Sequence, residues 1–129
     1  RSRIALNPHN VAFVRDAMVD VNVTGTARAA FVGVPYRVAG KTGTARKLRD
    51  GHYTDAYVAS FVGFAPASEA RVVIAVMIDE PRAGPCYAAD VAAPVFSQVA
   101  AGTLRALQVA PDAAPPMAVA SAEPQALAR

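Results

Sequence analysis

The sequence predicts an α+β fold in which one helix at each end flanks three antiparallel strands. Apolar residues recur at helical spacing over roughly residues 8–22 and again over 91–108, whereas the segment between them alternates as strands do. That middle segment also contains Asp50-Gly51, a dipeptide typical of β-hairpin turns. At 129 residues the chain has room for one ordinary domain, and its hydrophobic content of 53% is ample for a core.

The first helix is predicted over residues 8–22. Asn7-Pro8 supplies an N-cap followed by a residue suited to the first helical position. Gly25 stands where a helix usually ends, and residues 27–31 are expected to add a short helical turn. The apolar side of the first helix would be formed by Val11, Val14, Met18 and Val21.

Three strands are predicted from residue 36 onward. The first continues to the Asp50-Gly51 turn, the second covers 57–64, and the third, 71–78, is apolar on both faces as a central strand would be. Period two divides the first strand between two faces. One face would carry Tyr36, Val38, Gly40, Thr42 and Thr44, and the other Ala39, Lys41, Gly43 and Ala45.

Residues 79–90 are rich in Pro and Gly and are expected to form a surface loop. The loop contains Cys86, the only cysteine, which excludes an internal disulfide and whose expected role is loop packing. A helix over roughly 91–108 follows, with Pro94 in its first turn. Residues 1–109 are therefore the predicted folded part, and the Ala- and Pro-rich residues 110–129 a disordered tail.

Composition argues against several classes of function. The net charge is +3, but only Arg46, Lys47 and Arg49 cluster, and no aromatic residues lie between them to stack on bases, so nucleic-acid binding is disfavoured. The longest apolar run, residues 72–78, is too short to cross a bilayer. The two histidines have no cysteine or carboxylate pair at ligand spacing, so neither a metal nor another cofactor is expected.

A repeated pentapeptide is the most specific local signal. T-G-T-A-R occurs at 24–28 and again at 42–46, and only the second copy follows a lysine, Lys41. A nucleotide-binding P-loop also ends in G-K-T, but its first glycine would fall at Pro35, and the segment continues as a strand rather than opening a helix. In a purely structural interpretation, the strand glycines mark a bulge and Lys41 is a solvated charge at a sheet edge.

K-T-G is also the last element of the serine acyl-transfer signature S-x-x-K, S-x-N, K-T-G. The flanking sequence agrees, and the chain resembles the C-terminal part of a class B penicillin-binding protein, most closely the septal peptidoglycan D,D-transpeptidases of cell division. The resemblance implies a fold like that of penicillin-binding proteins and serine β-lactamases, of which residues 1–109 would be the C-terminal portion. It is carried by residues 36–47, 61–66, 73–81 and 91–96.

The resemblance implies a share of an active site. A serine attacks the D-Ala-D-Ala end of a stem peptide, and Lys41 and Thr44 would be catalytic, the latter through its backbone N–H in the oxyanion hole. The substrate would be bound by Thr42, Gly43 and Thr44, with attraction from Arg46. Aromatic walls at Tyr57 and Tyr87 are as compatible with ordinary packing as with binding.

The resemblance also implies partners and a location. These are peptidoglycan stem peptides, β-lactams and divisome proteins, at the periplasmic face of the bacterial inner membrane with an anchor outside this chain. None of the five serines has a lysine three residues later or an asparagine two residues later. The chain also begins at Arg1 rather than at a methionine. We therefore expect a fragment, inactive alone, whose nucleophile lies upstream; the alternative is a non-catalytic remnant or a structural or binding piece.

Overall fold

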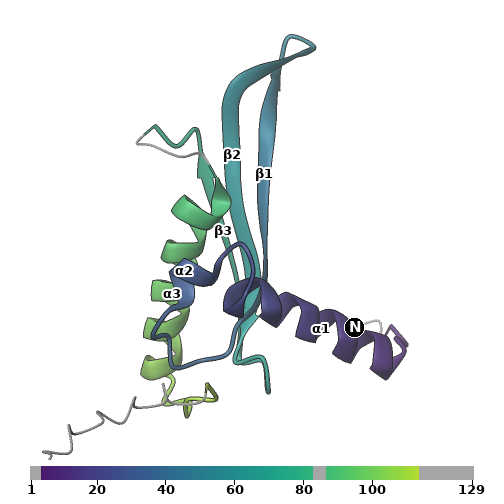
Figure 1. Ribbon diagram of the computed structural model, residues 1–129, viewed down its shortest axis with the longest axis vertical. Coiled ribbons are helices and arrows are strands. Elements are labelled where there is room, and N and C mark those ends of the chain that lie inside the picture. The colour runs from purple at the N-terminus through teal and green to yellow at the C-terminus, as the bar shows by residue number, and fades with distance from the viewer. Residues whose placement is uncertain (1–3, 83–86, 114–129) are drawn as a thin grey trace, which may run out of the picture.

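The computed structural model describes residues 4–82 and 87–113 and has the predicted α+β arrangement (Figure 1). Two helices precede a three-stranded antiparallel sheet, and a long helix follows it. In the described residues, no helix combines the length and the apolar character needed to cross a membrane. The elements are α1 (Pro8–Val23), α2 (Arg28–Phe31), β1 (Ala39–Arg49), β2 (His52–Ala65), β3 (Val72–Asp79) and α3 (Ala88–Ala106).

The hairpin of β1 and β2 is longer than predicted. Asp50 and Gly51 both have positive φ, at 51° and 79°, and form the two-residue turn that the sequence indicated. Beyond the core, both strands continue through exposed and half-buried residues to this turn and project past the end of β3 (Figure 1). Apolar alternation marks only the packed part of a strand, so it missed the extension at 52–56.

The third strand was expected to be central and covered on both faces, but among the described residues it lies at an edge of the sheet with one face covered. The strand order is β1-β2-β3, so β2 is central and β3 is an edge strand. Burial along β3 alternates strictly, and Val73 and Met77 are 77% and 75% exposed. A strand that is apolar on both faces is able to bury both of them, but the described residues cover only one face of β3.

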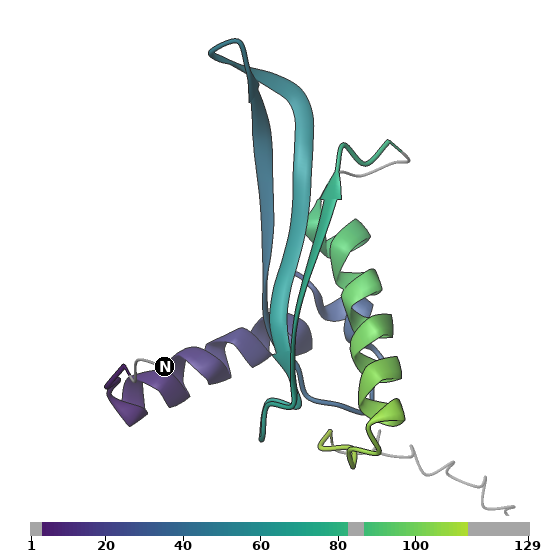
Figure 2. The same ribbon diagram turned by 180° about the vertical axis from the view of Figure 1, so that it is seen from behind.

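The hydrophobic core lies between the sheet and α3. In both views α3 runs along one face of the sheet, while α1 projects from the other side (Figures 1 and 2). Phe61 from β2 and Phe96 from α3 are fully buried, with ring centroids 4.7 Å apart. Phe31 from α2 packs against both rings, at 5.5 and 6.1 Å. Aromatic contacts of this kind add to the stabilisation from buried area.

The C-terminal end of α1 is fixed to the segment that leads into β1. Asn22 is buried, and its Nδ2 donates to the carbonyls of Val38 at 2.7 Å and Met18 at 3.3 Å. Val19 packs beside the buried Ala39, the first residue of β1. α1 therefore fixes the start of β1, the strand that carries K-T-G.

The last helix begins three residues earlier than predicted. Pro94 lies inside α3 rather than in its first turn, and the helix opens at Ala88, where the N–H groups of Asp90 and Val91 donate to the Tyr87 carbonyl. Proline lacks an N–H, so it removes one helical hydrogen bond without preventing the turn that precedes it. Cys86, for which loop packing was predicted, lies outside the described residues.

The predicted tail, residues 110–129, begins with four residues that the structure describes. Asp112 accepts hydrogen bonds from the backbone N–H of Arg37 at 2.7 Å and from Ser68 Oγ at 2.7 Å. Ala113 N–H donates to the Pro35 carbonyl at 3.2 Å. The contacts of the packed chain thus continue past the predicted boundary at 109, and residues 114–129 lie outside the described part.

Candidate functional site

The K-T-G segment lies on β1, which pairs with β2 on one side only. Lys41 is exposed, and its Nζ donates to the Thr42 carbonyl at 2.8 Å and approaches Thr42 Oγ1 at 3.4 Å. The opposite edge of β1 pairs with no strand among the described residues. Backbone groups at an unpaired edge are available to another peptide segment.

The β1–β2 register divides the motif between the two sheet faces. Thr42 and Thr44 lie opposite Phe61 and Ala59, on the face that α3 covers. Lys41 and Gly43 lie opposite Val62 and Ser60, on the other face. This is the alternation predicted from period two, and it places the lysine and the two hydroxyls on either side of one edge.

Gly43 stands close to the neighbouring strand. A Cβ added there would lie 2.7 Å from Ser60 Oγ, and that hydroxyl donates to the Gly43 carbonyl at 3.3 Å. Any larger residue would have to displace the Ser60 side chain. The absence of a side chain therefore keeps this part of the open face flat beside Lys41.

A pocket of about 240 Å³ forms where the K-T-G strand meets the start of α3. Tyr87, one of the two tyrosines predicted to wall a cleft, lines it and is 65% exposed. The N–H of Ala88 donates to Thr44 Oγ1 at 3.1 Å, which ties the strand to the helix. The residues lining the pocket are Thr26, Thr42, Thr44, Tyr87, Ala88, Ala89 and Asp90.

Arg46 and Tyr57 lie together but do not line this pocket. The Arg46 guanidinium lies 5.8 Å from the centroid of the Tyr57 ring and pairs with Asp55 at 2.5 Å. Its hydrogen bond with Asp55 raises the pKa of Arg46. Much of the charge of Arg46, which lies two residues beyond Thr44 along β1, is thus balanced by Asp55.

An ion-pair cluster was missed by sequence reasoning, which placed Asp79 and Glu80 in a surface loop. Lys47 Nζ contacts both carboxylates at 2.8 Å, and Arg49 pairs with Glu80. The register of the hairpin shifts between Arg46 and Leu48, and Lys47 lies at this irregularity. The cluster therefore joins β1 to the end of β3 across the central strand. Only the clustering of basic residues in the sequence hinted at a partner of opposite charge.

These ion pairs predict a pH-dependent stability. The hydrogen bond from Lys47 lowers the pKa of Glu80, so its stabilisation is present above the ordinary value of 4.5 and is lost as pH falls further. Bonds to Asp79 and Glu80 raise the pKa of Lys47, so its stabilisation is present below 10.5 and is lost at higher pH. Urea unfolding of wild type and Glu80→Gln should differ most between these limits.

The control for this measurement is Glu69→Gln. Glu69 is exposed and forms no ion pair within the described ranges 4–82 and 87–113. Its replacement should leave the pH profile of the unfolding free energy unchanged. A Glu80→Gln difference that is constant from pH 3 to pH 11 would contradict the ion-pair account.

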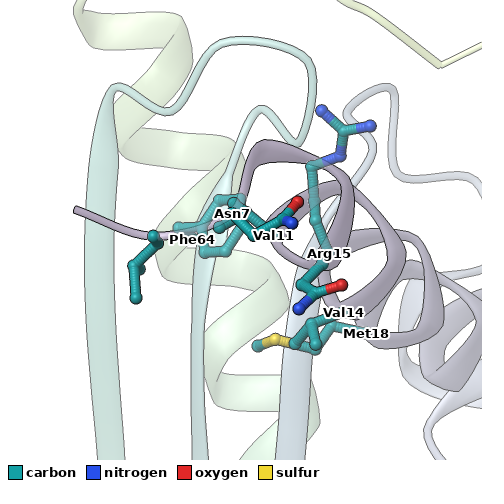
Figure 3. Close-up of a pocket in the computed structure, with 8 residues that line it drawn as sticks. Asn7, Val11, Val14, Arg15, Met18 and Phe64 are labelled. Carbon is teal, nitrogen blue, oxygen red and sulfur yellow. The ribbon is translucent and has the colours of Figure 1, made fainter.

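A larger pocket, of about 400 Å³, lies between α1 and the sheet (Figure 3). Its walls are mainly apolar, and Val11, Val14 and Met18 project from α1 near Phe64 of β2. Such a lining favours packing of apolar surface over recognition of a charged group. The smaller pocket, which three threonine hydroxyls line, is therefore the better candidate site.

Comparison with known proteins identifies the family of this chain. A family model described as the penicillin binding protein transpeptidase domain matches residues 2–101. The chain belongs to this family. A solved structure, the apo TP domain of penicillin-binding protein 3 from Burkholderia pseudomallei, is 41% identical with a TM-score of 0.75. The predicted transpeptidase fold is thereby confirmed.

Two curated relatives agree with this assignment. The chain is 48% identical over 99 residues to the Neisseria flavescens protein named "Probable peptidoglycan D,D-transpeptidase PenA", covering 76% of this chain and 25% of the relative. It is 46% identical over 90 residues to "Peptidoglycan D,D-transpeptidase FtsI" of Escherichia coli (strain K12), covering 69% and 15%. This transpeptidase-family chain thus spans a quarter or less of both relatives. The match to the solved Burkholderia domain covers 84% of this chain and 33% of that domain.

Proposed function

We propose that this chain is one portion of a serine-type peptidoglycan D,D-transpeptidase. The observation that carries the proposal is the placement of K-T-G on a free sheet edge, with Lys41 beside the Thr42 carbonyl and the hydroxyls of Thr42 and Thr44 at one pocket. An extended peptide that ends in a carboxylate needs an unpaired edge, a cation and hydroxyl donors. All three requirements are met within four residues of β1.

The geometry of β1 indicates which backbone N–H group is the oxyanion donor. Backbone groups of residues two apart on an antiparallel strand point in the same direction. The Thr42 carbonyl accepts from Lys41 Nζ, so we take this carbonyl to face the free edge, and the N–H of Thr44 with it. In the proposed reaction a serine oxygen attacks the stem-peptide carbonyl, and this N–H stabilises the resulting oxyanion. One such donor contributes about 10²–10³ in rate.

The other site residues have smaller roles in this proposal. Gly43 keeps the strand clear for the peptide, and Tyr87 walls the pocket beside Thr44. Arg46 attracts anionic substrates only weakly, because Asp55 and Tyr57 already hold its guanidinium. Recognition of the carboxylate therefore depends chiefly on Lys41 and the hydroxyls.

The proposed domain organisation assigns residues 1–109 to a transpeptidase domain and 110–129 to a tail. Support comes from exposed apolar side chains on the sheet face that α3 does not cover, where Val62, Val73 and Met77 are 48%, 77% and 75% exposed. Scattered apolar residues are normal on surfaces, but a contiguous set favours burial against another part of a domain. We propose that this further part supplies the S-x-x-K serine and the S-x-N motif.

The proposed setting is septal peptidoglycan synthesis. The FtsI relative supports it, as does the match to a penicillin-binding domain, and β-lactams would then acylate the same serine as the stem peptide. Divisome proteins as partners and the periplasmic face of the inner membrane as location complete the proposal. In this proposal, a membrane anchor in another part of the full-length protein holds the domain at that face.

The first test is covalent labelling by a fluorescent penicillin. We expect the isolated 129-residue chain to remain unlabelled, because none of its serines has a lysine three residues later. The full-length protein should be labelled stoichiometrically, and boiling before incubation should abolish this signal. Labelling of the isolated chain at one of its own serines would refute the assignment of the nucleophile to another part of the protein.

A second candidate is a non-catalytic remnant or binding piece of the same fold. The absence of S-x-x-K and S-x-N from these residues favours it. Sequencing the DNA that precedes the codon for Arg1 distinguishes the two candidates. In-frame S-x-x-K and S-x-N motifs there support the enzyme, whereas stop codons or unrelated sequence support the remnant.

A further inference from the structure

The two copies of T-G-T-A-R meet in the structure. Thr26, from the copy at 24–28, lines the same 240 Å³ pocket as Thr42 and Thr44 of the copy at 42–46. Sequence reasoning assigned chemistry only to the second copy, because no lysine directly precedes the first. The fold nevertheless brings a hydroxyl from each copy to one site.

The backbone around Thr26 is held firmly. Gly25 N–H donates to the Asp20 carbonyl at 2.9 Å, and a Cβ added at Gly25 would lie 2.9 Å from Val21 Cα. On the other side, Ala27 is only 1% exposed and donates to the Val21 carbonyl at 3.0 Å. Thr26 thus stands between two fixed residues, which sets the position of its backbone beside the pocket.

The hydroxyls have protons to donate. Thr44 Oγ1 accepts from Ala88 N–H at 3.1 Å, and Thr42 Oγ1 is approached by Lys41 Nζ at 3.4 Å. A hydroxyl that accepts a hydrogen bond still carries its own donor. The Thr26 hydroxyl forms no hydrogen bond to any residue that the structure describes, whereas Thr24 Oγ1 donates to the Asp20 carbonyl at 3.4 Å.

We propose that Thr26 is a substrate-binding residue whose hydroxyl donates to the carboxylate that ends the donor peptide, and to the equivalent carboxylate of a penicillin. The inference rests on the proposed transpeptidase function and extends it to a residue outside K-T-G. Thr26, Thr42 and Thr44 together form a hydroxyl wall, and a carboxylate accepts several such bonds at once.

Asp90 adds a negative charge to the pocket that the hydroxyl wall lines. It lines the same pocket in the first turn of α3, where a negative charge favours the helix. A carboxylate there repels an anionic ligand, so the pocket combines three threonine donors with one charge of the same sign as the ligand. Removal of that charge and removal of the Thr26 hydroxyl should therefore change anion binding in opposite directions.

The experiment compares benzylpenicillin with its methyl ester, which lacks the negative charge, in the full-length protein. Thr26→Val should lower the second-order acylation rate of the free acid about tenfold, the size of a hydrogen bond to a charged group. The rate for the ester should stay at the wild-type value, and Thr26→Ser should restore the rate for the acid. Thr24→Val, in the same repeat but outside the pocket, is the matched control and should change neither rate.

The second variant is Asp90→Asn. It should raise the acylation rate of the free acid several-fold and leave the ester unchanged, because only the acid meets the Asp90 charge. An equal loss for acid and ester in Thr26→Val would mean a structural role and overturn the inference. A slower free acid in Asp90→Asn would also overturn it, since the pocket would then favour a cation.

Failure of the proposed function has a different signature. Wild-type protein that no penicillin labels, or a Lys41→Ala variant that is labelled normally, would overturn the transpeptidase proposal and this inference with it. A normal Lys41 result with an unchanged ratio of acid to ester rates in Thr26→Val would overturn the role of Thr26 alone.

Discussion

Lys41→Ala should lower the rate of acylation by penicillin about 10²–10³-fold in the full-length protein, while the midpoint of urea unfolding stays at the wild-type value. The catalytic loss is expected because Lys41 is the cation at the free edge of β1, beside the Thr42 carbonyl. Removing a preorganised electrostatic group from an acyl-transfer site has effects of this size. Stability should be preserved because the side chain is exposed and forms no ion pair among the described residues.

Lys47→Ala is the matched control, because it removes the only other lysine, on the same strand. Lys47 is bonded to Asp79 and Glu80, so its loss should lower the unfolding midpoint at neutral pH while acylation stays near the wild-type rate. Lys41→Arg keeps the charge but changes its geometry, and it should retain part of the activity. Near wild-type acylation by Lys41→Ala would show that K-T-G was wrongly assigned.

Local patterns predicted the elements well. Asn7 caps α1 through its side chain, which accepts from His9 N–H at 2.9 Å, and Asp50-Gly51 forms the hairpin turn. Period two also placed Lys41 and Thr42 on opposite faces, since a strand fixes the direction of its side chains once its register is set. These features depend on neighbours in the sequence, and sequence reasoning has access to those.

What the sequence could not predict depends on contacts between distant segments. Thr26 reaches the pocket only because α1 is tied to the start of β1 through Asn22. Lys47 meets Glu80 only because β3 ends beside the middle of the hairpin, where Asp79 pairs with Val58. Sequence reasoning predicted Tyr57 and Tyr87 equally as walls of the cleft. Only Tyr87 lines the pocket, because it lies at the start of α3, whereas Tyr57 lies on the projecting hairpin. The repeated pentapeptide and the cluster of basic residues at 46–49 were the two sequence features that such contacts involve.

Gly63→Ala should destabilise the protein by about 3 kcal/mol, at the upper end of typical overpacking costs. Gly63 lies opposite Gly40, and an added Cβ would lie 2.5 Å from the Ala39 carbonyl oxygen and 3.0 Å from Gly40 Cα. Both are backbone atoms, so no rotamer change relieves the contact. Phe96, fully buried and 3.2 Å from the added carbon, blocks movement toward α3.

Gly102→Ala is the same substitution with the opposite expectation. Gly102 lies inside α3, and an added Cβ there has no atom within 4 Å. Alanine favours a helix over glycine by about 1 kcal/mol, so this variant should be more stable than wild type. Urea unfolding of both variants against wild type measures the two changes. Equal effects of the two substitutions would mean that the close approach of β1 and β2 at Gly63 is not a constraint.

The Gly63→Ala substitution should also disturb the candidate active site. Relief of the contact requires β1 to move away from β2 at Gly40, the residue immediately before Lys41. The free edge would then be displaced relative to α3, where Ala88 N–H holds Thr44 Oγ1. We therefore expect Gly63→Ala to slow acylation even where the protein remains folded, and Gly102→Ala to leave it unchanged. Wild-type acylation by folded Gly63→Ala would mean that the position of the K-T-G edge does not depend on this pair of glycines.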